Sequence, residues 1–325
     1  MAKSFLYANG VVASLTKNLI SKDAFNRMID ATSNTEALNV LQETNFGSGL
    51  TIDSPFEIEI LLNFETKKLL KFVKEESPTE PLTQLFLLPY DYANISSYCK
   101  GLILGQEVED FVQAEGNYEW LKIKDLISSK NFGGFNNKYI EDSLKEFQDA
   151  ASRNAIKGYE IDFLFKKYLY KNLKEVAKKD ATIKDIVNTK IDIENISNAM
   201  RSPTQFMFEQ QQLESGYLSL NQIQKIFNKD KSVLNEIKNE VVAAFAKLAM
   251  SEDKETSFVK FEVLKNKFIF SLISTQKFNI DTVGPFANYC FQKEAEIKNV
   301  RLVMSYQNNN LKDKIKSRFL EYYGG

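Results

Sequence analysis

The chain has 325 residues, of which 43% are apolar, so it can form one large core or two to three ordinary domains. Its 42 basic and 43 acidic residues nearly cancel, so no long-range field selects nucleic acid or an anionic membrane. It has no histidine, and Cys99 and Cys290 lack CxxC spacing; this excludes a zinc site or a histidine-based nucleophile and predicts two small buried cysteines.

Apolar spacing predicts an almost entirely α-helical chain, with only short stretches of alternating polarity. A first helix is expected over about 4–20, and a short second helix begins at Ser21. Ser33-Asn34-Thr35-Glu36 is a capping box that opens a third. Ser54-Pro55-Phe56-Glu57 combines a serine cap, a proline at the first helical position and a glutamate, so it predicts the start of a long helix.

Prolines and glycines indicate where the later helices begin and end. Pro78 and Pro81 are expected to break the long helix, and Pro89 to start the next one. The glycine-containing stretch 115–136 is predicted to be a junction, and Pro203 to end a helix. The remaining helices are expected at about 155–179, 181–202, 220–228, 232–251, 258–274 and 285–305, with a short basic helix within 311–323.

A short pattern, acid-x-x-Asn-aliphatic, occurs three times on these predicted helices. Its asparagines are 101 and then 104 residues apart. A second mark, an aromatic residue followed by glutamate and a β-branched residue, occurs at 56–58, 159–161 and 261–263. Two marks in one order at nearly constant spacing predict three divergent repeats, over 1–114, 115–215 and 216–325. The acid and asparagine pairs are Asp91 with Asn94, Asp192 with Asn195, and Glu296 with Asn299.

The three-residue spacing places the acid and the asparagine on neighbouring turns of one helical face. Two interpretations are open. The pair can brace the same buried junction in each repeat, or three equivalent helices can line a shared axis and present polar groups to a partner.

The known sequence motifs of catalysis are missing. There is no Walker loop, GxGxxG, HExxH or GxSxG. We therefore expect no cofactor and no metal, although carboxylate-based acid and base catalysis stays open. No run of about 18 apolar residues predicts a membrane span. On the residues alone, two functional classes stay open: a helical hydrolase or lyase that uses carboxylates, and a helical-repeat scaffold of a larger complex.

The last long helix carries the most specific resemblance to a known family. Residues 284–289 read Gly-Pro-Phe-Ala-Asn-Tyr, and residues 293–301 read Lys-Glu-Ala-Glu-Ile-Lys-Asn-Val-Arg. This segment closely resembles the C-terminal part of the C subunit of the A/V-type rotary ATPases, which is called the d subunit in eukaryotic enzymes. Residues 88–95 and 36–47 fit the same family, and so does the length of the chain.

The resemblance implies an all-α funnel of three lobes with pseudo-threefold symmetry. Such a protein caps the membrane ring of proteolipid subunits on the cytoplasmic side, and its central cavity receives the foot of the axle formed by the D and F subunits. It transmits torque and has no catalytic residues. One copy per complex is implied, monomeric when isolated.

The resemblance also suggests a role for three basic residues. Lys100 and Arg201 each follow their asparagine by six residues, whereas Arg301 follows Asn299 by two. A basic partner for the acid of the neighbouring lobe is therefore a hypothesis for two of the three repeats.

Overall fold

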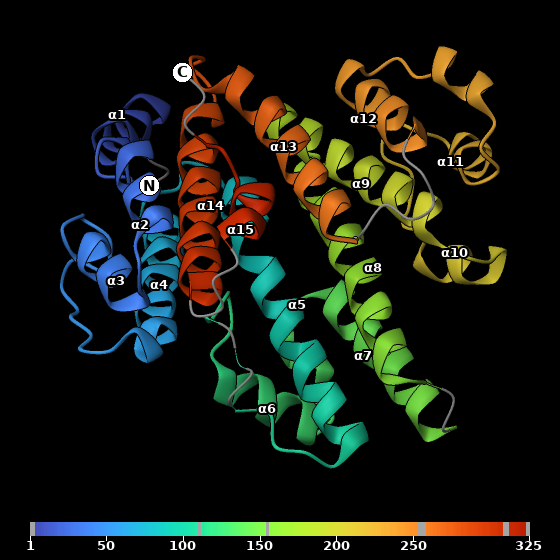
Figure 1. The fold of residues 1–325 in the computed structure, drawn as a ribbon. Helices are drawn as coiled ribbons and strands as arrows, with labels where there is room; N and C mark the ends of the chain where they lie inside the picture. The colour runs from blue at the N-terminus through green and yellow to red at the C-terminus, as the bar shows by residue number, and fades with distance from the viewer. Residues whose placement is uncertain are drawn as a thin grey trace. The chain divides into compact units, whose positions relative to one another are not determined.

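The computed structural model describes residues 4–109, 112, 114–153, 156–251, 258–307 and 312–322. Over these residues the chain is 75% helical, with fifteen α-helices, three short 3-10 helices and no strand (Figure 1). This confirms the predicted all-α class.

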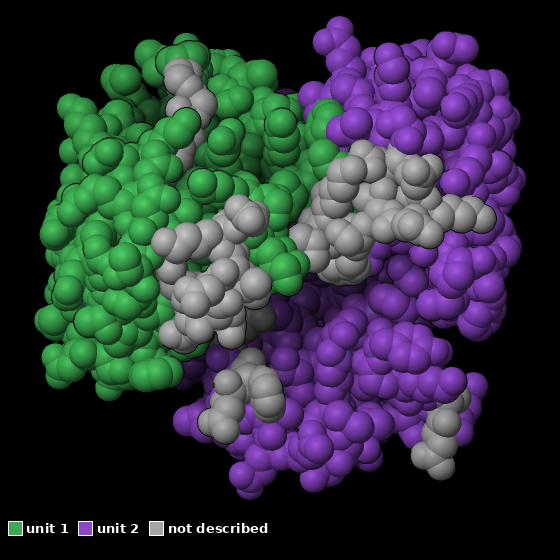
Figure 2. Space-filling view, viewed as in Figure 1, with its two compact units in different colours: residues 1–79, 256–325 green, residues 80–255 purple. Residues whose placement is uncertain are grey.

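The chain divides into two compact units, which are coloured separately in Figure 2. Unit 1 joins the two ends of the chain, residues 1–79 and 256–325, and unit 2 is the continuous stretch 80–255. These limits differ from the three predicted repeats, which remain a prediction.

The described part of unit 1 consists of seven α-helices and one 3-10 helix. They are α1 (Phe5–Thr16), α2 (Lys22–Asp30), α3 (Asn34–Gln42), η1 (Pro55–Glu57), α4 (Ile58–Glu76), α13 (Phe258–Gln276), α14 (Gly284–Gln307) and α15 (Lys312–Arg318).

Unit 2 contains the other described helices. They are α5 (Glu80–Leu104), α6 (Trp120–Ser128), η3 (Phe132–Phe135), α7 (Lys138–Ser152), α8 (Gly158–Ala177), α9 (Ala181–Arg201), α10 (Gln205–Gln211), α11 (Leu220–Phe227), η4 (Lys231–Asn235) and α12 (Glu240–Ser251).

Side-chain caps explain where several helices begin. Ser33 accepts a hydrogen bond from the backbone N–H of Glu36, as the capping box predicts, but the Glu36 carboxylate binds the N–H of Thr32 instead of that of the cap residue. At Ser54 the full capping box forms with Glu57. It opens η1, which runs directly into α4, so the predicted strong start is confirmed.

The core of unit 1 centres on α4 and α14, which lie side by side (Figure 1). The rings of Phe72 and Phe286 stack between them, with centroids 5.1 Å apart. Phe25 on α2 meets Phe319 edge to face at 5.1 Å. Aromatic pairs of this kind contribute about 0.5–1.5 kcal/mol beyond the area they bury. The chain's N-terminal helices and its C-terminal segment therefore share one core.

The core of unit 2 centres on α5, α8 and α9, and α5 corrects a prediction. Pro89 does not start a helix but lies inside α5, which begins at Glu80. An internal proline loses one hydrogen bond and costs about 3 kcal/mol. The buried face continues on both sides of it, through Leu88 before and Tyr92 after. Each fully buried apolar side chain gives about 1.5–3 kcal/mol, so burial outweighs the break.

Other differences concern short helices. The predicted junction 115–136 contains α6, and α7 and α10 were not predicted. The N-cap of α6 is Glu119, which makes no capping bond, so no start signal precedes its nine residues. The predicted helix 232–251 divides into η4 and α12. Cys99 and Cys290 are fully buried free thiols, as expected, and burial raises the pKa of both.

Candidate functional site

The three acid and asparagine pairs lie on the long helices α5, α9 and α14. All six side chains are buried, with at most 1% of their surface exposed. Burying a carboxylate or an amide is costly unless its hydrogen bonds are made inside the protein. The bonds of each pair therefore indicate what that pair does.

On α9, Asp192 and Asn195 bind the non-helical segment 213–218 that leads into α11. An Asp192 oxygen accepts a bond from the backbone N–H of Tyr217 at 2.7 Å. Asn195 makes two bonds to the same segment: its Oδ1 accepts from the N–H of Leu213 at 2.8 Å, and its Nδ2 donates to the carbonyl of Glu214 at 3.1 Å. The pair thus fixes a stretch of chain that has no helical bonds of its own.

On α5, the same arrangement holds the segment before α6. Asp91 Oδ1 accepts from the backbone N–H groups of Asn117 at 2.7 Å and Tyr118 at 3.2 Å. Asn94 Nδ2 donates to the carbonyl of Ala114 at 3.4 Å. The bond from Asn94 is longer than the corresponding bond on α9, and Asp91 adds two backbone bonds to the same segment.

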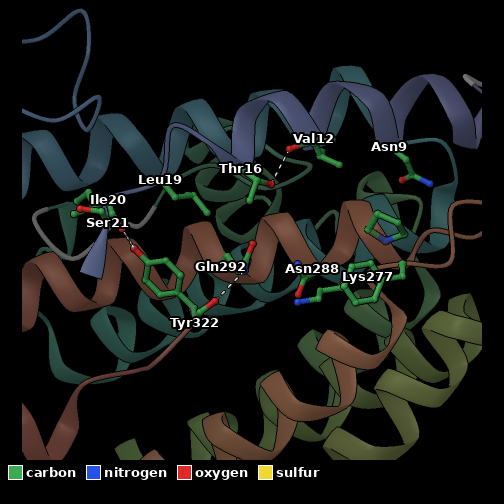
Figure 3. Close-up of a pocket in the computed structure, with 13 residues that line it drawn as sticks. Asn9, Val12, Thr16, Leu19, Ile20, Ser21, Lys277, Asn288, Gln292 and Tyr322 are labelled. Atoms are coloured by element: carbon green, nitrogen blue, oxygen red, sulfur yellow. Dashed lines mark hydrogen bonds between the residues drawn. The ribbon is translucent and has the colours of Figure 1, made fainter. Parts of the chain in front are cut away.

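On α14, the pair binds segments from both ends of the chain. Asn299 exchanges two bonds with the backbone of Leu320, each 2.9 Å long. Glu296 Oε1 accepts from the N–H of Ile20 at 2.6 Å. The Tyr322 hydroxyl donates to the carbonyl of Ile20 at 3.0 Å, a bond drawn in Figure 3. Helix α14 and the segment after α15 therefore hold the turn that precedes α2.

The three acids share one position relative to the helix that they serve. Each accepts a bond from the residue directly before an N-cap: Tyr118 before Glu119, Leu218 before Ser219, and Ile20 before Ser21. A carboxylate here satisfies backbone donors and sets the direction in which the helix leaves the junction.

Two glycines make the close approach possible in unit 2. A Cβ at Gly116 would collide with Asp91 Oδ1, and a Cβ at Gly216 would collide with Asp192 Oδ1. Sequence reasoning placed Gly116 in a predicted junction but linked neither glycine to an acid, although each precedes the bonded residue by one or two positions. The sequence signal for this role is that Gly116 and Gly216 follow Asn94 and Asn195 by nearly the same distance, 22 and 21 residues.

Burial perturbs the acids of two junctions. It raises the pKa of Asp192 to about 6, against the opposing effect of the backbone N–H groups that donate to it. It also raises the pKa of Glu296, opposed by the charge of Lys293. Burial tends to lower the pKa of Lys293, but Glu296 and Glu65 outweigh burial, so that pKa is raised.

Lys293 lies between two buried carboxylates in unit 1. Its Nζ is 2.6 Å from Glu65 Oε2 and 2.5 Å from Glu296 Oε2. It also lies over the ring of Phe46, 4.8 Å from the centroid. Glu65 in turn accepts from the N–H of Gly47 at 2.9 Å. This network connects α4 to α14. In the sequence, the clearest sign of it is Lys293, a charged residue on an otherwise apolar face of the predicted helix.

A model of the family described as ATP synthase (C/AC39) subunit matches residues 8–318 of the chain. The chain belongs to that family.

Two curated relatives are similar over nearly the whole of this chain. The C subunit of the A-type ATP synthase of Methanocaldococcus jannaschii is 22% identical over 337 residues, which covers 95% of this chain and 84% of the relative. The C subunit of the V-type sodium ATPase of Enterococcus hirae is 21% identical over 331 residues, which covers 97% of this chain and 98% of the relative. The resemblance to the C subunits of these ATPases is thereby confirmed.

The structure also places the three basic residues that follow the motif asparagines. Lys100 binds Asp162 at 2.5 Å. Asp162 belongs to the predicted second repeat but is not its motif acid, so the described pair differs from the one hypothesised. Arg301 binds Glu59 through two bonds of 2.9 Å. Arg201 is the last residue of α9.

The described residues of this C/AC39 chain offer no metal centre and no membrane span. In the part of the chain that the structure describes, no group of three or more His, Cys, Asp or Glu residues could hold a metal ion. Within the same residues, no helix of 18 or more residues is apolar enough to cross a bilayer.

Proposed function

We propose that this chain is the non-catalytic rotor subunit of an A/V-type ATPase, which links the central axle of D and F subunits to the membrane proteolipid ring. It transmits torque between them while ATP hydrolysis or synthesis is coupled to ion transport. It lies at the cytoplasmic face of the membrane as a peripheral component, in one copy per complex.

The observation that carries this proposal is the family match over residues 8–318, together with two ATPase C subunits that align along nearly the whole chain. A match over this length leaves little of the chain for a different activity. It favours a subunit of the ATPase over an unrelated scaffold or a carboxylate hydrolase.

The buried acid and asparagine pairs support a mechanical role. Each pair fixes a non-helical segment to a long helix through bonds to the backbone. A hydrogen bond buried in the protein is electrostatically stronger than one in water, so these buried bonds resist displacement of the segment. We therefore propose that the pairs brace the chain against load, and that partners meet other, exposed surfaces.

Co-purification tests the proposal. The full chain carrying an affinity tag would be expressed in the cell that makes the complex, and the complex would be recovered from detergent-solubilised membranes. We expect the proteolipid and the D and F subunits to be recovered together with the chain. The isolated chain should not hydrolyse ATP.

Torque transmission is tested with a brace variant. We expect Asn299→Leu to lower the number of ions transported per ATP hydrolysed in membrane vesicles, because a yielding joint lets the axle turn without the ring. Arg301→Ala, which removes an exposed ion pair from the same helix, is the control and should keep the wild-type ratio. Turnover by the isolated chain, or recovery without ring and axle subunits, would contradict the proposed function.

A further inference from the structure

The last turn of α5, in unit 2, exposes three apolar residues in succession. Leu102, Ile103 and Leu104 are 54%, 41% and 60% exposed, and they are the final residues of the helix. We call these three residues the α5 tip. Single exposed apolar side chains are common on protein surfaces, whereas a contiguous apolar group marks a contact with a protein or a membrane.

The α5 tip is a closed helix end, so its exposure does not come from fraying. Gly105 follows it in the left-handed conformation, with a φ of +63°. The backbone N–H of Gln106 donates to the carbonyl of Gly101 at 3.1 Å, which is the six-to-one bond of a Schellman motif. This bond satisfies a carbonyl that the helix end would otherwise leave free, as surroundings without water require.

The directions of the three side chains indicate what can surround them. Successive residues of an α-helix are about 100° apart, so the α5 tip covers about 200° of the helix circumference. A groove in a partner protein covers one side of a helix, where the apolar stripe is roughly 100° wide. Side chains that point in three directions are buried together only where the surroundings enclose the helix end. The acyl chains of a bilayer do this without a preformed pocket.

Aromatic side chains lie one turn behind the α5 tip. Tyr98, four residues before Leu102, meets Trp120 edge to face, with ring centroids 5.6 Å apart. Trp120 begins α6, which contacts this end of α5 (Figure 1). Leu121, next to Trp120, is 75% exposed and extends the apolar surface. Tyrosine and tryptophan are enriched where a membrane meets water, so this pair suits the level of the lipid head groups.

Ion pairs behind the tip limit how deep it can enter a membrane. Lys100 binds Asp162, and Lys124 binds Glu109 beside a hollow that Leu102 also lines. Because charged groups are costly in hydrocarbon, only the last turn of α5, about 5 Å long, can enter it. The charges cancel within each pair, so the burial of apolar surface, and not attraction to anionic lipid, is the expected source of binding.

We propose that the α5 tip inserts into the lipid surface of the membrane as a shallow anchor. Its three side chains contact the acyl chains, while Tyr98 and Trp120 lie among the head groups. An insertion of this depth is typical of interfacial helices, whose apolar faces are buried about 5–10 Å deep. The contact goes beyond the proposed function, which requires protein partners only.

Trp120 is the only tryptophan of the chain, so its fluorescence reports on this end of α5. The isolated full chain would be mixed with phosphatidylcholine vesicles whose acyl chains carry bromine, which quenches tryptophan at close range. We expect the chain to float with the vesicles and the emission of Trp120 to be quenched, at low and at high salt alike. A chain whose Trp120 stays unquenched, whether or not it floats, would overturn the proposal.

Serine substitutions show whether the α5 tip is the anchor. A variant with both Leu102→Ser and Leu104→Ser loses two exposed apolar side chains, and we expect its affinity for the vesicles to fall at least about tenfold. Phe206→Ser removes an exposed apolar side chain from α10 of the same unit and should bind like the wild type. Thermal unfolding of the isolated variants would show that both fold. Equal affinities of the two variants would contradict the assignment.

Photo-crosslinking in the assembled complex separates lipid from protein as the occupant. A benzophenone amino acid would replace Ile103 in the full chain, and irradiated membranes would be analysed by mass spectrometry. We expect an adduct with phospholipid. An adduct with a proteolipid or axle subunit alone would show that a protein encloses the tip, and this result, or the absence of any adduct, would overturn the proposal.

Failure of the lipid contact and failure of the proposed function are distinguishable. If the wild type co-purifies with ring and axle while the vesicle and crosslinking tests fail, only the lipid contact is wrong. If the wild type does not co-purify, the proposed function is wrong, and the vesicle experiments on the isolated chain still decide the lipid contact.

Discussion

The junctions of unit 2 and the junction of unit 1 reach the same backbone bonds by different means. In unit 2 the acid is aspartate, and a glycine lets the following segment approach closely. In unit 1 the acid is Glu296, one methylene longer, and it reaches Ile20 from a distant part of the chain. A longer side chain thus spans a junction whose two sides are not joined by a short connection.

The two units also differ in how lysine is used. In unit 1, Lys293 contacts Glu296 itself at 2.5 Å. In unit 2, Lys174 donates instead to the backbone carbonyl of Ser215, at 2.5 Å, beside Asp192. The comparison teaches that backbone bonding by an acid and an asparagine is the common element, whereas charge compensation is local. Substitutions at single residues can separate these two contributions.

The largest effect is expected at Lys293. Lys293→Met leaves Glu65 and Glu296 as two buried carboxylates without their shared cation. Breaking a buried ion pair on one side costs about 3–5 kcal/mol. Urea denaturation should show a loss of this size in the free energy of unfolding, whereas Lys71→Met, at an exposed position, should change it by less than about 0.5 kcal/mol. A small effect at Lys293 would mean that charge does not hold this junction.

A smaller effect is expected for the asparagines. Asn195→Leu and Asn299→Leu each leave a buried N–H and a buried carbonyl without partners, which costs about 2–4 kcal/mol. The free energies of unfolding of the two variants, from urea denaturation, measure this cost. No loss at either position would remove the bracing role.

The close contact between Gly216 and Asp192 can be tested with two glycine-to-alanine substitutions. Gly216→Ala places a Cβ against Asp192 and a backbone carbonyl, and should cost about 1–3 kcal/mol through overpacking. Gly10→Ala, within open space on α1, should instead stabilise the isolated chain by about 0.5–1 kcal/mol. Thermal unfolding would show opposite signs. Two changes of the same sign would mean that local helix preference, not the close contact, decides.

The smallest expected effect concerns pH. Because the folded pKa of Asp192, about 6, lies above its unfolded value, the folded state binds a proton more readily. Protonation of Asp192 therefore stabilises the folded state fully below the unfolded pKa of 3.8, and this contribution is lost as the pH rises through the folded pKa of about 6. Between pH 7 and pH 5 the wild type should gain about 1 kcal/mol relative to Asp192→Asn, in parallel urea titrations. A constant difference would show that the carboxyl is not perturbed.

The sequence predicted the parts of the fold that carry local signals. The all-α class followed from periodicity, and the start of α4 from Ser54 and its capping box. Pro89 was wrongly predicted to start a helix, because the prediction considered only its local effect on the backbone. The apolar side chains buried on both sides of Pro89 outweigh that effect and keep α5 continuous. Short helices such as α6 were missed because nine residues without a cap carry little periodic signal.

The sequence predicted the side chains of the site but not the backbone segments that they bind. The motif located Asn195 and Asp192, but their partners lie 18–26 residues downstream in a non-helical segment with no sequence pattern of its own. The contact between Glu296 and Ile20 spans 276 residues, and only the folded chain brings them together. Local spacing can therefore identify the side chain that binds but not the segment that it binds.

The division of unit 1 between the two ends of the chain has a consequence for synthesis on the ribosome. Residues 1–79 emerge first, yet the α14 segment against which they pack is made only after residue 255. At about 5–20 residues per second, the nascent N-terminal helices wait on the order of ten seconds or more with their apolar faces uncovered. We expect the continuous unit 2 to fold first, and nascent-chain chaperones to engage the N-terminal helices during this interval.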